Sequence, residues 1–440
     1  MIKRIITLCA VLTFLFTALL SGCGGKTEKL NPGDESKQTG TQAGKPAEPK
    51  KITFWRAGTE PEWDTHWKQT FAGLEKNNIK VETAGLPWGN EIETKLNAAY
   101  ASGTGPDLLH YSIASIAQRA GLGQYASLDD YISKWSDKDD IMESIYDLGK
   151  YKGKIYGLGW NPDPRVFVWR KDLFQQAGLD PEKAPKDWKQ LAEYAVKLTK
   201  KEGNNTVIAG FNIPIANGFQ TFQIFSLQNG VALIDVDKND PLFDKPDAIE
   251  AAAYLNDLVK KGVNIPVDQF KSQGNPWTLG NAAMSYESPQ GVAALLKNKP
   301  DLAGKIGVAP PLENKAKGTF CGLGLFFISA DSKNKDAAWE AVKAAMTKEE
   351  MMRRYKELGT PIVRKSLKDE FIKDKPEMNK ATFDAISVGQ GAAKVIYSTK
   401  LNDTISQGLE QAYYGKKSAE QAMKDAAAEL RKEIPNLIGK

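Results

Sequence analysis

The chain has 440 residues, a formal net charge of +5 at pH 7 and 41% hydrophobic residues. A chain of this length exceeds one simple hydrophobic core, so we expect two lobes or domains. Its lysines and arginines are spread along the sequence without a basic block that alternates with aromatic residues, which argues against nucleic-acid binding.

Residues 1–22 have the pattern of a secretory leader. Lys3 and Arg4 precede the apolar run IITLCAVLTFLFTALL, which has the length of a signal peptide and is short for a membrane span. The segment LSGC, which ends at Cys23, resembles a bacterial lipobox. That resemblance implies cleavage before Cys23 and lipidation of its thiol, and the alternative is an uncleaved transmembrane anchor.

Residues 23–50 are expected to be the lipidated cysteine and a disordered tether, because Leu30 is the only large apolar residue between 24 and 50. Two acyl chains on Cys23 would anchor the protein stably to the membrane. We therefore expect the folded part at the extracellular face of a bacterial cell membrane. Cys9 would leave with the leader, so Cys321 would be the only free thiol and no intrachain disulfide or thiolate metal site could form.

From Lys51 onward, strand-like and helix-like patterns alternate. Trp67, Phe71 and Leu74 recur at i, i+4 and i+7, which is typical of one face of a helix. Such alternation predicts an α/β fold with a mostly parallel sheet that is covered by helices. The predicted strands of the first part are 51–55, 79–86, 106–112 and 154–160.

The second part continues the same alternation. A helical pattern starts at Trp188, and another ends at Gly262, a residue type common just after helices. Thr347 with Glu350, and Ser418 with Gln421, have the spacing of capping boxes. The predicted strands of this part are 207–213, 282–288, 305–310 and 324–330.

The stretch YGLGWNPDPRVFVWR, from Tyr156 to Arg170, contains the strongest candidate binding residues. Aromatic faces and planar polar groups are the side chains that recognise sugars. Asp163 and Arg165 could hold adjacent hydroxyls, and the neighbouring prolines would stiffen them before binding. The alternative is an internal salt bridge between these two residues. For Trp88 and Trp160, which lie beside Pro and Gly, we favour a binding surface over a core position.

Signatures of catalysis are sparse. His66 and His110 are the only histidines, and no zinc-protease, nucleophile-elbow or P-loop motif occurs. The run DVDKND starts like a calcium loop, but Asp240 stands where Gly is needed and Pro246 where a bidentate Glu is needed, so a polar hairpin is expected. We therefore expect that the chain is not an enzyme and that it binds no cofactor and no metal. A glycoside hydrolase stays open, because it needs only two carboxylates.

The chain resembles the extracellular solute-binding lipoproteins of ABC importers, in the large sugar-binding class typified by maltose-binding protein. The resemblance spans the mature chain and is strongest at GTGPDLL and WRKDLF, with further matches at ITFWRAGTEPEWDTHWKQTFAGLEKNNIKVE, TLGNAAMSYESPQGVAALL and GTPIVRKS. It implies a type II periplasmic-binding-protein-like fold, in which each lobe is a mostly parallel sheet flanked by helices.

The resemblance also implies three crossings between the lobes and closure about a hinge. The crossings are expected near residues 160–164, 308–313 and 359–364. The expected division of the folded part is 51–161 plus 312–362 for lobe 1, and 162–311 plus 363–440 for lobe 2.

Ligand contacts carry over from the family to matching positions of this sequence. Gln290, in ESPQ, stands where a stacking Trp is common, and CGLGLFF differs from the more usual GGWGL; both differences bear on which sugar class is bound. The expected ligand-binding residues are Arg56, Glu60, Trp88, Tyr111, Ser112, Trp160, Asn161, Asp163, Arg165, Gln290 and Tyr397.

The resemblance implies a monomeric, lipid-anchored receptor that captures an oligosaccharide and delivers it to the transmembrane subunits of an ABC permease. Alternatives are a receptor for a peptide or an acidic compound, a surface glycoside hydrolase, and a receptor that signals through a membrane sensor. Arg56, Arg165 and Arg364 could serve an acidic ligand, and in that case one of them should lack a carboxylate partner in the cleft.

Overall fold

The structure, a computed structural model, describes residues 48–214, 218–265 and 275–439. Its first strand, β1 (Lys50–Ala57), forms because its side chains alternate between two environments. Ile52 and Phe54 are fully buried, whereas Lys51 and Thr53 are exposed. The strand therefore lies in a sheet with the core on one face.

That sheet has the strand order β15-β14-β3-β1-β2, and β6 also pairs with β14. Strand β1 runs parallel to β2 and β3, as predicted, whereas β14 runs antiparallel to β3 and β6. The other strands of the sheet are β2 (Ile79–Leu86), β3 (Leu108–Ser112), β6 (Gly157–Pro164), β14 (Thr319–Ile328) and β15 (Gly389–Gln390).

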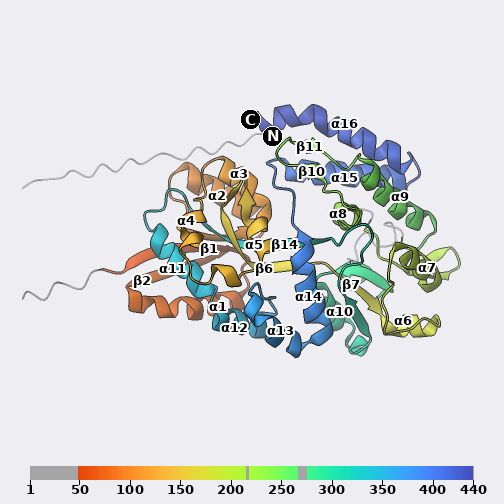
Figure 1. Ribbon diagram of the computed structural model, residues 1–440, viewed down its shortest axis with the longest axis horizontal. Coiled ribbons are helices and arrows are strands. Elements are labelled where there is room, and N and C mark those ends of the chain that lie inside the picture. The colour runs from red at the N-terminus through yellow and green to blue at the C-terminus, as the bar shows by residue number, and fades with distance from the viewer. Residues whose placement is uncertain (1–47, 215–217, 266–274, 440) are drawn as a thin grey trace, which may run out of the picture. The chain divides into compact units, whose positions relative to one another are not determined.

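Helices cover this sheet and enclose the first hydrophobic core (Figure 1). Trp67 and Phe71 pack against Phe54 with ring centroids 5.3 and 5.4 Å away, so the predicted helical face points inward. We call the elements around this core the first lobe. Its helices are α1 (Pro61–Ala72), α2 (Asn90–Ala101), α3 (Ile116–Gly121), α4 (Asp129–Ser133), α5 (Glu143–Gly149), α11 (Lys335–Ala345), α12 (Lys348–Leu358) and α13 (Lys368–Asp374).

A second sheet, β12-β7-β13, lies between two further apolar clusters. Phe167 and Trp169 of β7 face one cluster and Val168 faces the other, as the alternation of a strand requires. Both β12 and β13 run antiparallel to β7, so the expectation of a mostly parallel sheet is wrong for these strands. The reason is that β7 continues directly from β6 and enters the sheet in the direction opposite to its neighbours. The strands are β7 (Val166–Arg170), β12 (Met284–Glu287) and β13 (Ile306–Ala309).

The elements around these two clusters form what we call the second lobe. Asp187 begins α7 by accepting a hydrogen bond from the Gln190 N–H at 2.8 Å. The helices of this lobe are α6 (Lys171–Gln176), α7 (Trp188–Leu198), α8 (Phe219–Gln228), α9 (Pro246–Lys260), α10 (Pro289–Asn298), α15 (Ser398–Tyr413) and α16 (Ala419–Ile438).

Local signals in the sequence are confirmed. The Thr347 and Ser418 side chains accept hydrogen bonds from the N–H groups of Glu350 and Gln421, and Gly262 takes a left-handed conformation (φ 70°) just after α9. The DVDKND run is the predicted hairpin. Antiparallel pairs are β4 (Lys150–Tyr151) with β5 (Lys154–Ile155), β8 (Lys200–Glu202) with β9 (Asn205–Ile208), and β10 (Ile234–Asp235) with β11 (Asp240–Pro241).

Two of the three crossings lie later in the chain than expected. Leu312 and Phe320 both belong to the second lobe's core, so the second crossing runs through β14 and not near 308–313. Ile362 and Val363 are fully buried in the first core, which excludes a crossing near 359–364. The chain instead leaves the first lobe along α14 (Pro376–Val388) and β15, and α14 packs against both β6 and β13.

Candidate ligand-binding site

The first two crossings form a hydrogen-bonded pair of strands. Asp163 of β6 lies opposite Gly322 of β14, and Asn161 lies opposite Gly324, next to a register irregularity. Asn161 and Asp163 share one face because residues two apart in a strand point the same way. The facing glycines have no side chains, so this face stays open. A Cβ at Gly324 would overlap Nε2 of His110.

A cavity of about 310 Å³ opens on this face. Its walls come from three sources: strand ends of the first lobe, the two crossing strands, and the start of α10 in the second lobe. We call it the crossing cavity. Its lining residues are Trp88, His110, Ser112, Asn161, Asp163, Ser288, Gln290, Gly322, Leu323 and Gly324.

Three buried polar atoms of the crossing cavity lack a hydrogen-bond partner among the described residues: Oδ1 of Asn161, Oδ1 of Asp163 and Nε2 of His110. Burial, with the nearby Arg56 and Arg354, lowers the pKa of His110 to about 3, so its imidazole is neutral at physiological pH. Buried polar atoms without partners are rare in folded proteins. Such atoms also occur in the cores, for example at Trp160 and Arg354, but three of them line this one cavity.

Trp88 provides the aromatic surface of the crossing cavity. It is 54% exposed and stacks on Tyr111, with ring centroids 5.8 Å apart and an interplanar angle of 28°. Tyr111 is itself buried, and burial together with Glu93 raises the pKa of its hydroxyl. Tyr111 therefore supports Trp88 from below, and Trp88 presents the face on which a ligand ring could lie.

Asp163 and Arg165 form the salt bridge that the sequence left as an alternative. Nη1 of Arg165 donates to Oδ2 of Asp163 at 2.8 Å and to its carbonyl oxygen at 3.0 Å. Nη2 reaches Oε1 of Gln220 at 3.4 Å. The ion pair compensates the carboxylate's charge, and it leaves Oδ1 of Asp163, a residue that lines the crossing cavity, without a partner among the described residues.

A second cavity, of about 300 Å³, lies on the second lobe beside Arg165. Glu287 lines it and accepts hydrogen bonds at Oε1 from Ser285 and Asn275, at 2.9 and 3.1 Å. Burial raises the pKa of Glu287 against the opposing effect of these hydrogen bonds. Its walls are polar, with Asn212, Gln220 and Thr221 among them.

Trp160 was expected at the cleft wall, but it is only 1% exposed and lies outside both cavities. Its ring packs between Trp67, Phe326 and the guanidinium of Arg354, with ring–ring distances of 5.1 and 5.4 Å. On strand β6, Trp160 points away from the face that carries Asn161 and Asp163. It is the core residue that supports the crossing from beneath.

Arg56 and Tyr397 also lie in the interior. Arg56 is 1% exposed and donates to the carbonyl oxygens of Gly58 and Glu60 and to Asp64, so it fixes the loop after β1. Tyr397 is buried at the start of α15, where its hydroxyl bonds Asn239 at 2.9 Å.

Glu60 immediately precedes α1 on the surface, 3.6 Å from Arg56, and lines neither the crossing cavity nor the cavity beside Arg165.

Five predicted residues therefore meet in the crossing cavity, namely Trp88, Ser112, Asn161, Asp163 and Gln290, and Arg165 lies in the cavity beside it. Cys23, the predicted lipidation site, lies outside the described residues.

His110, Ser288, Gly322 and Gly324 were missed by the sequence analysis. A signal existed for His110, since it precedes Ser112 by two positions in LLHYS and so shares its face of the strand. The alternate glycines in CGLGL were a second signal, because they leave one strand face bare.

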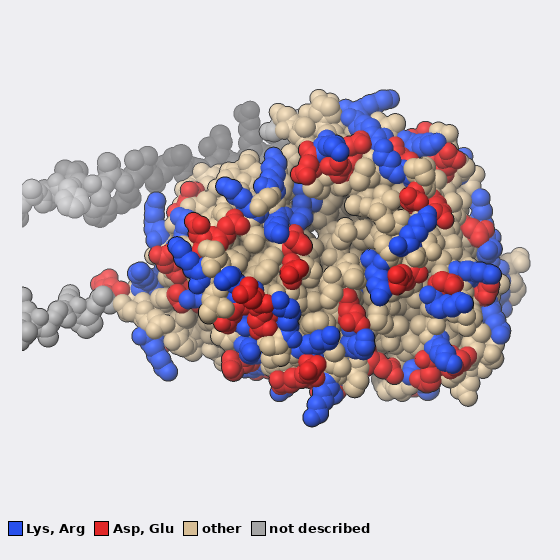
Figure 2. Space-filling model, in the orientation of Figure 1, with Lys and Arg blue, Asp and Glu red and all other residues tan. Residues whose placement is uncertain are grey.

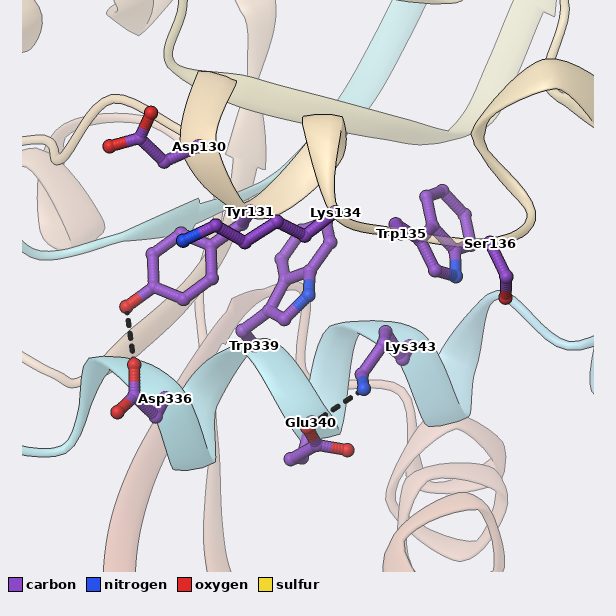
Figure 3. Close-up of a pocket in the computed structure, with 9 residues that line it drawn as sticks. All are labelled: Asp130, Tyr131, Lys134, Trp135, Ser136, Asp336, Trp339, Glu340 and Lys343. Atoms are coloured by element: carbon purple, nitrogen blue, oxygen red, sulfur yellow. Dashed lines mark hydrogen bonds and ion pairs between the residues drawn. The ribbon is translucent and has the colours of Figure 1, made fainter.

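A larger hollow, of about 630 Å³, lies between α4 and α11 of the first lobe (Figure 3). Tyr131 and Trp339 lie side by side on its floor, with ring centroids 5.5 Å apart. Several of its polar groups already have partners: the Tyr131 hydroxyl donates to Asp336 at 2.8 Å, and Lys343 pairs with Glu340 at 2.8 Å. We call it the first-lobe groove; it lacks the unpartnered buried atoms of the crossing cavity among the described residues.

The three arginines considered for an acidic ligand all have carboxylate partners. Arg56 pairs with Asp64, Arg165 with Asp163, and Arg364 with both Asp137 and Asp140. On the visible face, positive and negative side chains are interspersed (Figure 2).

Neither a metal site nor a membrane helix is found in the described part of the chain. No group of three His, Cys, Asp or Glu side chains there could hold a metal ion. No helix within residues 48–214, 218–265 and 275–439 is long and apolar enough to cross a membrane.

Comparison with known proteins places these features in a family. A binding protein of Brucella abortus is 23% identical over 363 residues, covering 80% of this chain and 85% of that protein. The maltotriose-binding protein of Pyrococcus abyssi is 25% identical over 298 residues, covering 65% of this chain and 61% of that protein. The sugar-binding protein MalE of Xanthomonas citri has the same fold, with a TM-score of 0.78 at 21% identity over 88% of this chain and 98% of that one.

The two-lobed α/β fold predicted from the sequence is thus confirmed. Residues 57–352 match the family described as bacterial extracellular solute-binding protein. The chain belongs to this family of bacterial extracellular solute-binding proteins.

Proposed function

We propose that the chain captures a carbohydrate in the crossing cavity and delivers it to an ABC permease. The observation that carries this proposal is the cluster of three unpartnered buried atoms, on Asn161, Asp163 and His110, beside the exposed face of Trp88. Hydroxyl groups donate to the Asn161 and Asp163 oxygens and can donate to or accept from an imidazole nitrogen, and the apolar face of a sugar ring stacks on an indole. A maltotriose-binding relative and a sugar-binding structural neighbour support the same ligand class.

Charge supports an uncharged ligand over an acidic one. Asp163 is the only carboxylate that lines the crossing cavity among the described residues, and Arg165 compensates it. Because Arg56, Arg165 and Arg364 are all paired, none offers a free guanidinium to an anion. This arrangement favours neutral hydroxyl-rich molecules.

We further propose that the chain acts as a monomeric lipoprotein held at the extracellular face of the membrane by a lipidated Cys23. The LSGC sequence and the apolar leader support this anchor. The proposed lobes follow the apolar cores, so 312–320 joins lobe 2 and 363–374 joins lobe 1, in place of the boundaries expected from the sequence. Helix α14 is shared, because Phe383 and Ile386 belong to the first core and Ala381 and Ala385 to a cluster of the second lobe. The chain's role is binding without catalysis.

The test is thermal unfolding of the purified chain against a panel of neutral and acidic oligosaccharides, followed by calorimetry on those that stabilise it. A ligand at a hundredfold excess over its Kd should stabilise the native state by about 2.7 kcal/mol. Asp163→Ala should weaken binding by about 10- to 100-fold, because it removes a charge-assisted acceptor.

Asp172→Ala is the matched control. Asp172 pairs with Arg170 at 2.6 Å, at the same two-residue spacing as Asp163 and Arg165, but it lies outside both cavities. It should leave affinity unchanged. Equal loss of binding in both variants would point to a general structural effect and not to the site. Absence of stabilisation by every sugar, or steady release of products from a polysaccharide, would contradict the proposal.

A further inference from the structure

A second inter-lobe cavity, of about 590 Å³, lies along the third crossing. Its walls come from α5 of the first lobe, from α8 and the β10 region of the second lobe, and from the segment that follows α14. It shares no lining residue with the crossing cavity or with the cavity beside Arg165. We call it the third-crossing cavity.

Lys394 brings a positive charge to this cavity. Its Nζ donates to the carbonyl oxygen of Asp147 at 2.6 Å. The Asp147 carboxylate is turned to Lys150 instead, at 2.7 Å. Within the described residues, no carboxylate oxygen lies within 4.0 Å of the Lys394 ammonium.

Lys171 has the ion-pair partners that Lys394 lacks. Lys171 is, like Lys394, half-buried, and it is paired with Glu182 at 2.5 Å and Glu377 at 3.7 Å. Those partners raise the pKa of Lys171, whereas burial lowers the pKa of Lys394 to about 8. A partly desolvated ammonium without an anion is stabilised when an anion binds to it.

The wall of the third-crossing cavity contains apolar side chains as well as polar ones. Leu148 and Leu233 are buried in its wall, and Val236 is 41% exposed. The other lysine in the wall, Lys317, lies 3.6 Å from Glu313 and is therefore paired. Lys394 is thus the cation of this wall that forms no ion pair within the described residues, although the charge of Asp147, which also lines the wall, acts on it from farther away.

We propose that the third-crossing cavity binds a small organic carboxylate, whose negative group pairs with the Lys394 ammonium and whose apolar part lies against Leu148, Leu233 and Val236. The occupant contacts both lobes and the third crossing at once, because the walls come from all three. The site is independent of the carbohydrate proposal, since the two cavities share no residue.

The test uses the purified chain with ¹³C-labelled lysine, and follows the Cε resonance of Lys394, assigned with Lys394→Arg. Butyrate is the probe and butanamide, its uncharged analogue, is the control. Butyrate should shift the resonance saturably and raise the pKa of Lys394 by about one unit, as a close anion does. Butanamide should do neither.

Two variants separate the site from general effects of salt. Lys394→Met should abolish the stabilisation of the chain by butyrate against thermal unfolding, while Lys317→Met should retain it. Both variants are first checked for a native unfolding transition. The proposal is overturned if butyrate leaves the Lys394 resonance unmoved, if butanamide acts equally, or if the stabilisation survives in Lys394→Met.

Discussion

The crossing cavity and the first-lobe groove contain similar side chains but differ in how those side chains are engaged. Both combine aromatic rings with carboxylates, and the groove, at about 630 Å³, is twice the size of the crossing cavity at about 310 Å³. In the groove, Tyr131 already bonds Asp336 and Trp339 is only 5% exposed. In the crossing cavity, Trp88 is exposed and the acceptors of Asn161 and Asp163 are unpartnered.

The difference teaches that neither size nor composition identifies a binding site. An aromatic ring that is packed on both faces stabilises the fold, whereas a ring with one free face can bind a ligand. A buried acceptor without a partner is unfavourable until a ligand donates to it. The crossing cavity also draws its walls from both lobes, so an occupant can bring them together.

The largest effect that would test this comparison is expected in the groove. Trp339→Ala should lower the free energy of unfolding by about 3–5 kcal/mol, because it leaves a large void in the first core. Its ligand affinity should stay unchanged. Denaturant unfolding and calorimetry measure the two quantities, and a substantial loss of affinity would show that the groove takes part in binding.

The next effect concerns pH and the imidazole of the crossing cavity. The pKa of His110 is about 3 in the folded chain, below its ordinary value, so the unfolded chain binds more protons between these values. This contribution to stability is therefore complete above pH ~6.5 and is lost as pH falls. The loss of folding stability from His110 between pH 6.5 and pH 4.5 should amount to about 2–3 kcal/mol.

His110→Gln isolates this contribution, because glutamine does not titrate and carboxylates elsewhere affect both proteins equally. Denaturant unfolding at several pH values should give a shallower loss of stability for His110→Gln than for the parent chain. Parallel pH profiles would mean that His110 is protonated in the folded state, and would remove it as a neutral imidazole in the crossing cavity.

The smallest effect is expected at Trp88. Trp88→Ala should weaken carbohydrate binding by about tenfold, since one stacking face contributes about 1–2 kcal/mol. The free energy of unfolding should change by less than about 0.5 kcal/mol, because the side chain is mostly exposed. Calorimetry and denaturant unfolding give both values. The opposite pattern, lost stability with intact binding, would make Trp88 equivalent to Trp339.

The sequence by itself determined the local elements and the fold class. Apolar spacing predicted α1 with Trp67 and Phe71 inward, and the capping residues Thr347 and Ser418 mark helix starts as predicted. These features depend on neighbours within a few residues, so they can be read from a short window. The family pattern supplied the two-lobed architecture.

Tertiary structure alone decided which candidate side chains face the cavities. Trp160 and Asn161 are adjacent in the chain, yet the alternation of β6 buries the first and turns the second toward the crossing cavity. Arg56 donates its hydrogen bonds to the loop that follows β1. The salt bridge between Asp163 and Arg165 leaves only Oδ1 of the Asp163 carboxylate without a partner among the described residues. The direction of β7 and the positions of the later crossings also depend on how distant strands pair. A linear sequence gives the types of side chains present, but burial and partners depend on contacts between residues far apart in the chain.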